Sequence, residues 1–279
     1  MDVGFREIAG VRTRVLSVHG TGTPILLLHG FSDHAAGWRA LLQELEARGH
    51  AALALDLPGF GRADRMRPGP VLPQLADFVE EAVRRVAAEQ GPPLVVGNSL
   101  GGAAVWAAAQ RSRLPLAGIV AIAPAGFGFT RRVRLGRRIL TRTPAGTPVP
   151  LLPMPVLRFL LVRGYAHGAG PGRRLDPAVA RAWIGQFSRR GDLRDAAGLV
   201  ARVLREIDGV GELPVPAYPV RMVWGTRDRL VRPDRPVPGT ESIRVAGWGH
   251  CPQLEHPEAL ADLVLEFGSR LPAAQPRPA

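Results

Sequence analysis

The residues with the clearest chemical potential lie in the octet VVGNSLGG at positions 95–102. Gly97, Ser99 and Gly101 fill the pattern Gly-x-Ser-x-Gly, in which a serine occupies a sharp turn between a strand and a helix. Such a turn brings the chain before and after it into close contact, so its neighbouring positions need glycine. The octet predicts a nucleophilic serine, and a glycine-rich loop ahead of a helix is the alternative that the octet alone leaves open.

A serine hydroxyl is a weak nucleophile and needs a base that is itself oriented by an acid. Ligands of parallel sheets bind beyond the carboxyl ends of the strands, so we look for the base and the acid there. Asp228 follows a predicted strand at 219–224, and His250 follows a predicted strand at 242–246. The chain order Ser99, Asp228, His250 is one in which such triads occur.

Other polar residues are weaker candidates for these roles. Asp234 could replace Asp228 as the acid, but it lies further past the strand end and is expected to begin a surface helix. His256 is expected to be structural, and the single cysteine, Cys251, is expected to be a small buried side chain. The remaining histidines have no comparable context: His19, His34, His50 and His167.

The elements that must position these residues alternate between strands and helices. Short apolar runs predict strands, and apolar residues at helical spacing predict helices. In the first half of the chain they predict strands at 5–9, 11–18, 25–28, 51–57, 93–98 and 116–123 and helices at 36–48, 73–89 and 100–111. This alternation is typical of a parallel sheet with both faces covered by helices.

The alternation stops from about 127 to 212, in a segment rich in Arg, Pro and Gly that we call the Arg-rich segment. Two helices are predicted in it, one starting at Asp176 and one at about 193–208. After this segment, strands resume and a last helix is predicted at 257–271. The domain boundaries that follow are a core at 1–126 and 213–271, an inserted helical cap at 127–212, and a disordered tail at 272–279.

The chain resembles the α/β-hydrolase fold family, in its serine-nucleophile branch of esterases and lipases. The likeness covers nearly the whole chain and rests on five motifs in register: His29-Gly30-Phe31, Asp56 to Gly61, the serine turn, Trp224 to Asp228, and Gly249-His250 with Glu255-His256-Pro257. The resemblance implies an α/β fold with a mostly parallel sheet flanked by helices and an inserted helical cap. It also implies a catalytic triad of Ser99, His250 and Asp228.

An enzyme of this kind must stabilise the negative charge that develops on the substrate carbonyl oxygen, and two preplaced N–H donors do so. We expect these donors to be the backbone N–H groups of Leu100, directly after the nucleophile, and Phe31, in the loop after the first parallel strand. His29 and Gly30 are expected to shape that loop. Asp56 is expected to hold the neighbouring loop without taking part in the chemistry.

The expected reaction is hydrolysis of a carboxylic ester or thioester through an acyl-enzyme. Ser99 excludes the aspartate-nucleophile branches, the haloalkane dehalogenases and epoxide hydrolases. The spelling Gly-Asn-Ser-Leu-Gly-Gly also resembles the carbon–carbon hydrolases that cleave ring-fission dienones, although the stretch Phe31 to His34 departs from their glycine-richer loop. A non-hydrolytic acyl-transfer, cyclase or ligand-binding member of the fold is a third alternative. No cofactor or metal is implied, and the sequence assigns no substrate contacts.

The charge of the chain is concentrated in one segment. All 36 basic residues are arginine, the formal net charge is +12, and residues 125–205 carry 16 arginines against three aspartates. Together with the apolar stretch 151–162, this favours either an entrance for substrates with an apolar acyl part and an anionic head, or a buried cap helix from which Arg158 and Arg163 extend to solvent. An acyl group on an acidic carrier protein or on coenzyme A would fit, as would lipid at an anionic membrane surface. Nucleic acid is not expected as a partner, because the arginines do not alternate with an aromatic binding motif.

Composition and cysteine content limit the class of protein and its expected location. A hydrophobic fraction of 46% is ordinary for a globular protein. The first ten residues lack the basic and apolar regions of a signal peptide, and no apolar run is long enough to span a bilayer. One cysteine excludes an internal disulfide and a multi-cysteine metal site. We therefore expect a cytoplasmic protein.

Overall fold

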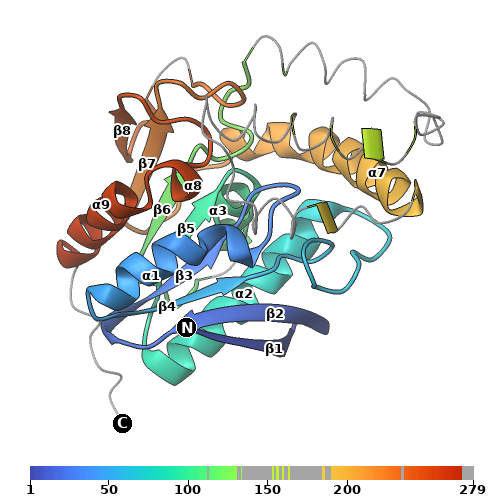
Figure 1. The fold of residues 1–279 in the computed structure, drawn as a ribbon. Helices are drawn as coiled ribbons and strands as arrows, with labels where there is room; N and C mark the ends of the chain where they lie inside the picture. Colours follow the sequence, from blue (N-terminus) through green and yellow to red (C-terminus); the bar gives the residue numbers. More distant parts are fainter. Residues whose placement is uncertain are drawn as a thin grey trace.

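In a computed structural model of the chain, the alternating segments form an eight-stranded sheet (Figure 1). The structure describes residues 1–111, 113–130, 190–233 and 236–271, with a few single positions between 133 and 185. The strand order is β1-β2-β4-β3-β5-β6-β7-β8. The hairpin of β1 and β2 is antiparallel and joins β4 in an antiparallel pair, whereas all pairs from β4 to β8 are parallel. The predicted α/β fold with a mostly parallel sheet is confirmed.

The strands coincide with the predicted apolar runs to within a few residues. In the described part of the chain they are β1 (Asp2–Ile8), β2 (Val11–Val18), β3 (Thr21–Leu28), β4 (His50–Leu55), β5 (Leu94–Asn98), β6 (Gly118–Ile122), β7 (Val220–Gly225) and β8 (Glu241–Val245).

Apart from the short α8, the helices agree equally well with the predicted periodicity. Among the described residues they are α1 (Arg39–Ala47), α2 (Val71–Gln90), α3 (Leu100–Arg111), α7 (Arg190–Glu206), α8 (Pro252–Glu255) and α9 (Pro257–Ser269), with 3-10 turns at η1 (Ala35–Trp38) and η2 (Ile207–Glu212).

The central strands are apolar without interruption because both of their faces are buried. Successive side chains of a strand point to opposite faces. In β3, Leu26 and Leu28 belong to one apolar cluster, and Ile25 and Leu27 belong to a second cluster on the other face. All four are at most 2% exposed. A continuous apolar run is therefore the pattern that this position in the sheet requires.

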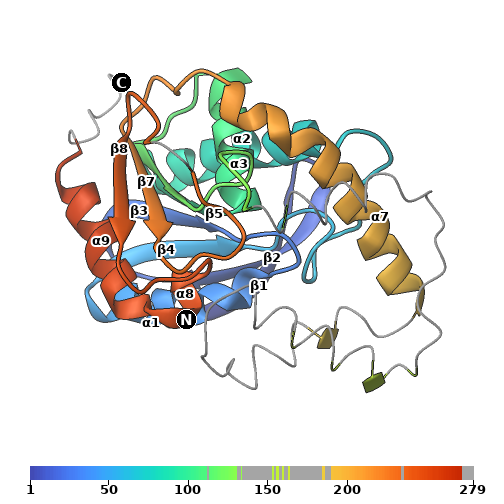
Figure 2. The same ribbon diagram turned by 90° about the horizontal axis from the view of Figure 1, so that it is seen from above.

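Helices cover the two faces of the sheet in two layers. α2 and α3 pack on the face that carries Leu26 and Leu28, and α1 and α9 pack on the face that carries Ile25 and Leu27 (Figure 2). No helix among the described residues is long and apolar enough to cross a membrane. The layered core fixes the strand ends, and the loops after those ends carry the candidate site.

The helix α7, which ends the Arg-rich segment, is tied to the loop between β4 and α2. Its Arg202 donates to the carbonyl oxygens of Arg67 and Gly69. Its last residue, Glu206, accepts hydrogen bonds from the backbone N–H groups of Val71 and Leu72 at 2.7–2.9 Å. These N–H groups begin α2 and have no partner within that helix. Glu206 thus caps α2 from 134 residues away along the chain.

The clearest differences from the sequence prediction are at β1, β3 and α8. β1 begins at Asp2 rather than at residue 5, because nearly all of its residues are exposed and show no apolar pattern that could mark its start. β3 begins at Thr21 rather than at residue 25, because its first three residues are exposed and are not apolar. The short helix α8 was not predicted, since its four residues are too few to show a helical period. Apart from residues 184 and 185, which are helical, the helix predicted from Asp176 lies outside the described residues, as do most of the cap and the tail at 272–279. The domain boundaries thus stay a prediction.

We expect Glu206→Ala to lower the free energy of unfolding by about 1–2 kcal/mol, because α2 loses its capping acceptor and a negative charge at its N-terminus. Urea denaturation followed by circular dichroism measures this change. Glu212→Ala, at an exposed position of η2, is the matched control and should leave the midpoint unchanged. Equal stability of the Glu206→Ala variant and the wild type would contradict the capping role.

Candidate active site

Ser99 occupies a strained turn between β5 and α3. Its φ is 50°, in the left-handed region that non-glycine residues rarely adopt. The turn is held because the N–H of Ser99 donates to Ile122 O at 2.8 Å and its carbonyl oxygen accepts from Ala103 and Ala125 at 3.0 Å. The turn therefore presents Ser99 at the carboxyl end of a buried strand, as the sequence pattern predicts.

The glycines beside Ser99 are required by space. A Cβ on Gly97 would lie 2.6 Å from the carbonyl carbon of Gly101, and a Cβ on Gly101 would overlap the carbonyl oxygen of Leu28 in β3. A Cβ on Gly30, in the loop after β3, would lie 3.2 Å from the Cβ of Ser99. At Gly97 and Gly101 the main chain thus comes so close that only glycine fits, and at Gly30 the contact with Ser99 is tight.

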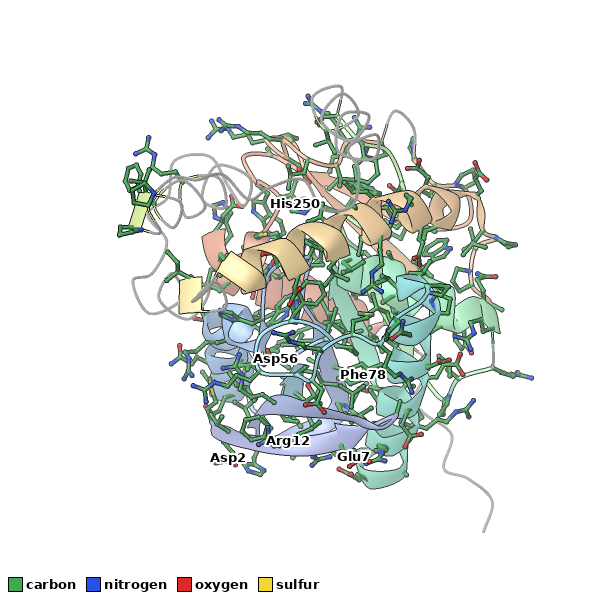
Figure 3. The ribbon with its side chains drawn as sticks, turned by 90° about the vertical axis from the view of Figure 1, so that its right-hand side faces the viewer. Asp2, Glu7, Arg12, Asp56, Phe78 and His250 are labelled. Atoms are coloured by element: carbon green, nitrogen blue, oxygen red, sulfur yellow. The ribbon has the colours of Figure 1, made fainter. Side chains whose placement is uncertain are left out.

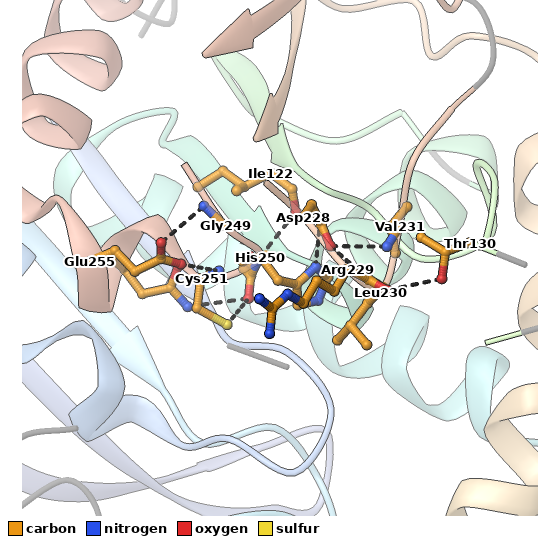
Figure 4. A network of polar contacts seen from close by, with 12 residues as sticks. Ile122, Thr130, Asp228, Arg229, Leu230, Val231, Gly249, His250, Cys251 and Glu255 are labelled. Carbon is orange, nitrogen blue, oxygen red and sulfur yellow. Dashed lines mark hydrogen bonds and ion pairs between the residues drawn. The ribbon is translucent and has the colours of Figure 1, made fainter. Parts of the chain in front are cut away.

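Asp228 and His250 form a buried pair beyond the ends of β7 and β8. The Nδ1 of His250 lies 2.8 Å from Oδ2 of Asp228, and the two residues are 5% and 4% exposed (Figure 4). The other carboxylate oxygen of Asp228 accepts from the backbone N–H groups of Leu230 at 2.7 Å and Val231 at 3.1 Å. This arrangement places the imidazole proton on Nδ1 and leaves Nε2 as the acceptor.

The loop after β3 is fixed by the ring of His29. The N–H of Leu57 donates to Nε2 at 2.8 Å, so this nitrogen carries no proton, and Nδ1 donates to Gly30 O at 2.7 Å. The bond that Nε2 accepts requires the neutral imidazole. Burial lowers the pKa of His29 below its ordinary value, although the nearby Asp56 carboxylate acts in the opposite direction. The ring of Phe60 packs edge-on against both His29 and Phe31.

Asp56 anchors the far end of the same loop. It is fully buried inside the molecule, unlike Asp2 at the lower edge of Figure 3. Its carboxylate accepts two hydrogen bonds from Arg14, at 2.9 and 3.0 Å, and one from the N–H of Ala35 at 2.6 Å. The N–H of Arg62 adds another at 2.7 Å. Asp56 therefore joins the loop after β3 to the loop after β4, and its contacts leave it a structural role.

Phe31 and Leu100, the expected donors to a substrate oxygen, lie in the loop after β3 and at the start of α3. Leu100 begins α3, and the first N–H groups of a helix have no partner within it. Phe31 follows Gly30, whose Cα approaches the serine closely. The two backbone N–H groups thus belong to the two segments that meet at the nucleophile.

The other candidate residues lie elsewhere or lack the right chemistry. Asp234 and His167 lie outside the described residues. His256 stacks on Trp248 with an interplanar angle of 11°, and His19 is exposed beside Asp2. Burial raises the pKa of Cys251 well above its usual range, so its thiol stays protonated and is a poor nucleophile.

Two further polar residues, Asn98 and Glu255, belong to the site and were not assigned a role in it from the sequence. Both are buried and hydrogen-bond to the main chain around His250. The signal for Asn98 was its place directly before the nucleophile, in a strand that is otherwise apolar. Among the residues that the structure describes, no group of three or more His, Cys, Asp or Glu side chains could hold a metal ion.

The lowered pKa of His29 predicts a loss of stability at acid pH. His29 binds a proton near pH 6.5 in the unfolded chain and only at lower pH in the folded chain. Its contribution to the free energy of unfolding is therefore fully present above about pH 6.5 and is lost as the pH falls through this value. We expect this fall, measured by urea denaturation between pH 7.5 and 5, to be less steep in His29→Gln. His34, whose pKa burial also lowers, accounts for part of the remaining slope.

His50→Gln is the control for this experiment, because His50 is only half-buried at the start of β4. It should keep the wild-type dependence on pH. An unchanged slope in His29→Gln would show that the ring of His29 does not stay neutral in the folded protein.

Comparisons with known proteins agree with this fold. A curated relative, an uncharacterized protein of Mycobacterium tuberculosis, is 27% identical over 94% of this chain and 80% of its own. The pimeloyl-[acyl-carrier protein] methyl ester esterase of Aeromonas salmonicida is 28% identical over 89% of this chain and 96% of its own. The crystal structure of Cfl2 from Burkholderia cenocepacia superposes with a TM-score of 0.75, at 20% identity and 95% coverage of both chains. The model of the alpha/beta hydrolase family matches residues 25–263, and the chain belongs to that family.

Proposed function

We propose that the protein is a serine hydrolase that cleaves a carboxylic ester or thioester through an acyl-enzyme on Ser99. The observation that carries this proposal is the buried hydrogen bond between Asp228 and His250. The loop that carries His250 is itself hydrogen-bonded to Asn98, the residue before Ser99. An imidazole whose Nδ1 is held by a carboxylate can accept a proton on Nε2. The relatedness to an esterase that acts on a methyl ester supports the choice of bond.

The proposed reaction proceeds in two halves. Ser99 Oγ adds to the substrate carbonyl carbon while its proton moves to Nε2 of His250, and Asp228 stabilises the resulting imidazolium. The backbone N–H groups of Phe31 and Leu100 donate to the oxyanion, an interaction worth about 3–4 kcal/mol per donor in the transition state. The carbon–oxygen or carbon–sulfur bond then breaks, and His250 returns the proton to the leaving group. Water repeats these steps on the acyl-enzyme and releases the acid.

Hydrolysis of a carbon–carbon bond in a ring-fission dienone is the second candidate. The observation that favours it is the presence of Asn98 in the motif Gly-Asn-Ser-Leu-Gly-Gly. A non-hydrolytic acyl-transfer, cyclase or ligand-binding role is a third. A panel of acyl esters graded by chain length and charge, run beside a dienone, separates the three, because only the first candidate turns over simple esters as its main activity.

Ser99→Ala and His250→Ala should each lower kcat for a p-nitrophenyl ester by several orders of magnitude, because each removes a group that takes part in bond breaking. Asp228→Asn should cause a similar or smaller loss, since it disturbs the imidazole tautomer and removes the charge that stabilises the imidazolium but leaves Ser99 and His250 in place. Circular dichroism should be unchanged in all three, because none of these side chains builds the apolar core.

Cys251→Ala is the control, because it removes the only thiol and should leave kcat close to the wild type. Full activity of Ser99→Ala would remove the proposed nucleophile. Full activity of Asp228→Asn together with an inactive Asp234→Asn would move the acid to Asp234.

We also propose that the Arg-rich segment favours amphiphilic substrates with an anionic head, such as an acyl group on an acidic carrier protein or lipid at an anionic membrane surface. The excess positive charge of residues 125–205 supports this. So do the described side chains of this segment: Val156 is 42% exposed, Phe159 is 61% exposed, and the guanidinium of Arg163 lies 5.8 Å from the ring centre of Phe159. Exposed apolar area next to positive charge suits an amphiphile.

Reversing Arg131, Arg134 and Arg138 to Glu should raise KM several-fold for an anionic ester and leave KM for a neutral ester of equal size unchanged. The reason is electrostatic steering, which acts on charged substrates only. The advantage of the wild type should shrink as salt rises, because the screening length is about 10 Å at 0.1 M. Equal effects on both esters, or a kcat/KM that does not depend on salt, would refute steering.

A further inference from the structure

The side chain of Asn98 links the nucleophile turn to the loop that carries the base. Its Nδ2 donates to the carbonyl oxygen of His250 at 2.9 Å and to that of Ile122 at 3.2 Å. Its Oδ1 accepts from Nε2 of Gln253 at 3.2 Å, and the thiol of Cys251 points at the same oxygen from 3.7 Å. Donors on one side and carbonyls on the other fix the orientation of the amide.

Glu255 holds the same loop from its other side. Its carboxylate accepts the N–H of Gly249 at 2.9 Å and the N–H of Cys251 at 3.3 Å, which are the backbone donors directly before and after His250 (Figure 4). Glu255 is 6% exposed and ends the short helix α8. Three backbone groups around one histidine are therefore bound by two buried side chains.

This loop needs such support because of its place in the sheet. It follows β8, which is the last strand in the sheet order and pairs with β7 alone. On the acid side, the loop is tied to the segment that carries Asp228, since the N–H of Arg227 donates to Trp248 O at 2.8 Å. On the nucleophile side, the carbonyl of His250 itself is held by the residue adjacent to Ser99.

We propose that Asn98 and Glu255 are positioning residues that hold the main chain of His250 and thereby set the imidazole against Ser99. This inference rests on the proposed function, in which His250 moves the proton. Asn98 couples the two reacting residues directly, because it shares a peptide bond with Ser99 and a hydrogen bond with His250. A displacement of about 1 Å in such a relay can cost 100-fold in rate.

The deciding test compares two esters of the same acid with different leaving groups. p-Nitrophenolate leaves without a proton, whereas ethoxide must receive one from His250. Asn98→Ala should lower kcat/KM about 10-fold to 100-fold for the p-nitrophenyl ester and roughly 10-fold more for the ethyl ester, with KM changed little. Active sites are counted by titration with a fluorophosphonate, so that a misfolded fraction does not contribute.

Glu255→Gln is the second variant, because an amide keeps one acceptor and places a donor against the other N–H group. It should give the same preference for the good leaving group, with a smaller loss. Cys251→Ala is the matched control: it removes a side chain that faces the same oxygen of Asn98 and leaves the bonds to the main chain of His250 in place. It should behave as the wild type.

Losses that are equal for both leaving groups, or that Cys251→Ala reproduces, would overturn the positioning role and leave Asn98 as a structural contact. The rate of fluorophosphonate labelling separates this inference from the proposed function. If the wild type is labelled at Ser99 but hydrolyses no ester, the proposed substrate class fails. Slower labelling of Asn98→Ala would then still support the positioning role, and an unchanged rate would overturn it. If the wild type is not labelled, both proposals fail.

Discussion

The candidate site depends on how closely the main chain approaches itself around Ser99. The strand before the serine, the helix after it and the end of β3 meet at distances where a single added methyl group would overlap backbone atoms of Gly101 or Leu28. The strained φ of Ser99 is maintained by hydrogen bonds from both sides of the turn, to β6 and to the segment that follows it. Strain of this kind persists only where the surrounding structure determines the conformation. The apolar layers on both faces of the sheet provide that surrounding structure.

The loops around the turn are fixed by buried polar groups rather than by apolar packing. His29 and Asp56 hold the two ends of the loop after β3, and both reach the loop after β4. Burying the charges of Asp56 and Arg14 is costly unless both are fully bonded, and here the carboxylate has four hydrogen bonds. The result is a loop whose backbone N–H groups keep their direction before any ligand arrives, which is what stabilising a transient charge requires.

Most of the fold follows from the sequence, because the central strands and the helices that cover them are buried on defined faces. β3 and β5 have the uninterrupted apolar runs of strands with two covered faces, and α2 has an apolar stripe at helical spacing. The start of β1 could not be predicted, since an exposed hairpin has no such pattern. For the site, the positions of Ser99, Asp228 and His250 followed from motif spacing at strand ends.

The side-chain contacts that hold the site could not be predicted from the sequence. Asp56 binds Arg14, 42 residues away, and Asn98 binds the main chain of His250, 152 residues away. Hydrogen bonds between residues far apart along the chain produce no periodic pattern in a sequence. They follow from the loop conformations, which the local pattern of residues does not determine.

The chain leaves the sheet for the Arg-rich segment after β6 and returns to it before β7, and these strands are neighbours. The two ends of the segment are also joined to each other and to the loop after β7. Phe129 pairs with Val231, the N–H of Arg232 donates to Gly128 O, and Gly211 lies against Gly126. The segment thus leaves the sheet and returns to it at neighbouring strands, and its ends are held together. Doubling the length of such a connection costs only about 0.6 kcal/mol of loop entropy. Evolution can therefore lengthen, shorten or replace this segment while the strand register that holds Ser99, Asp228 and His250 is untouched.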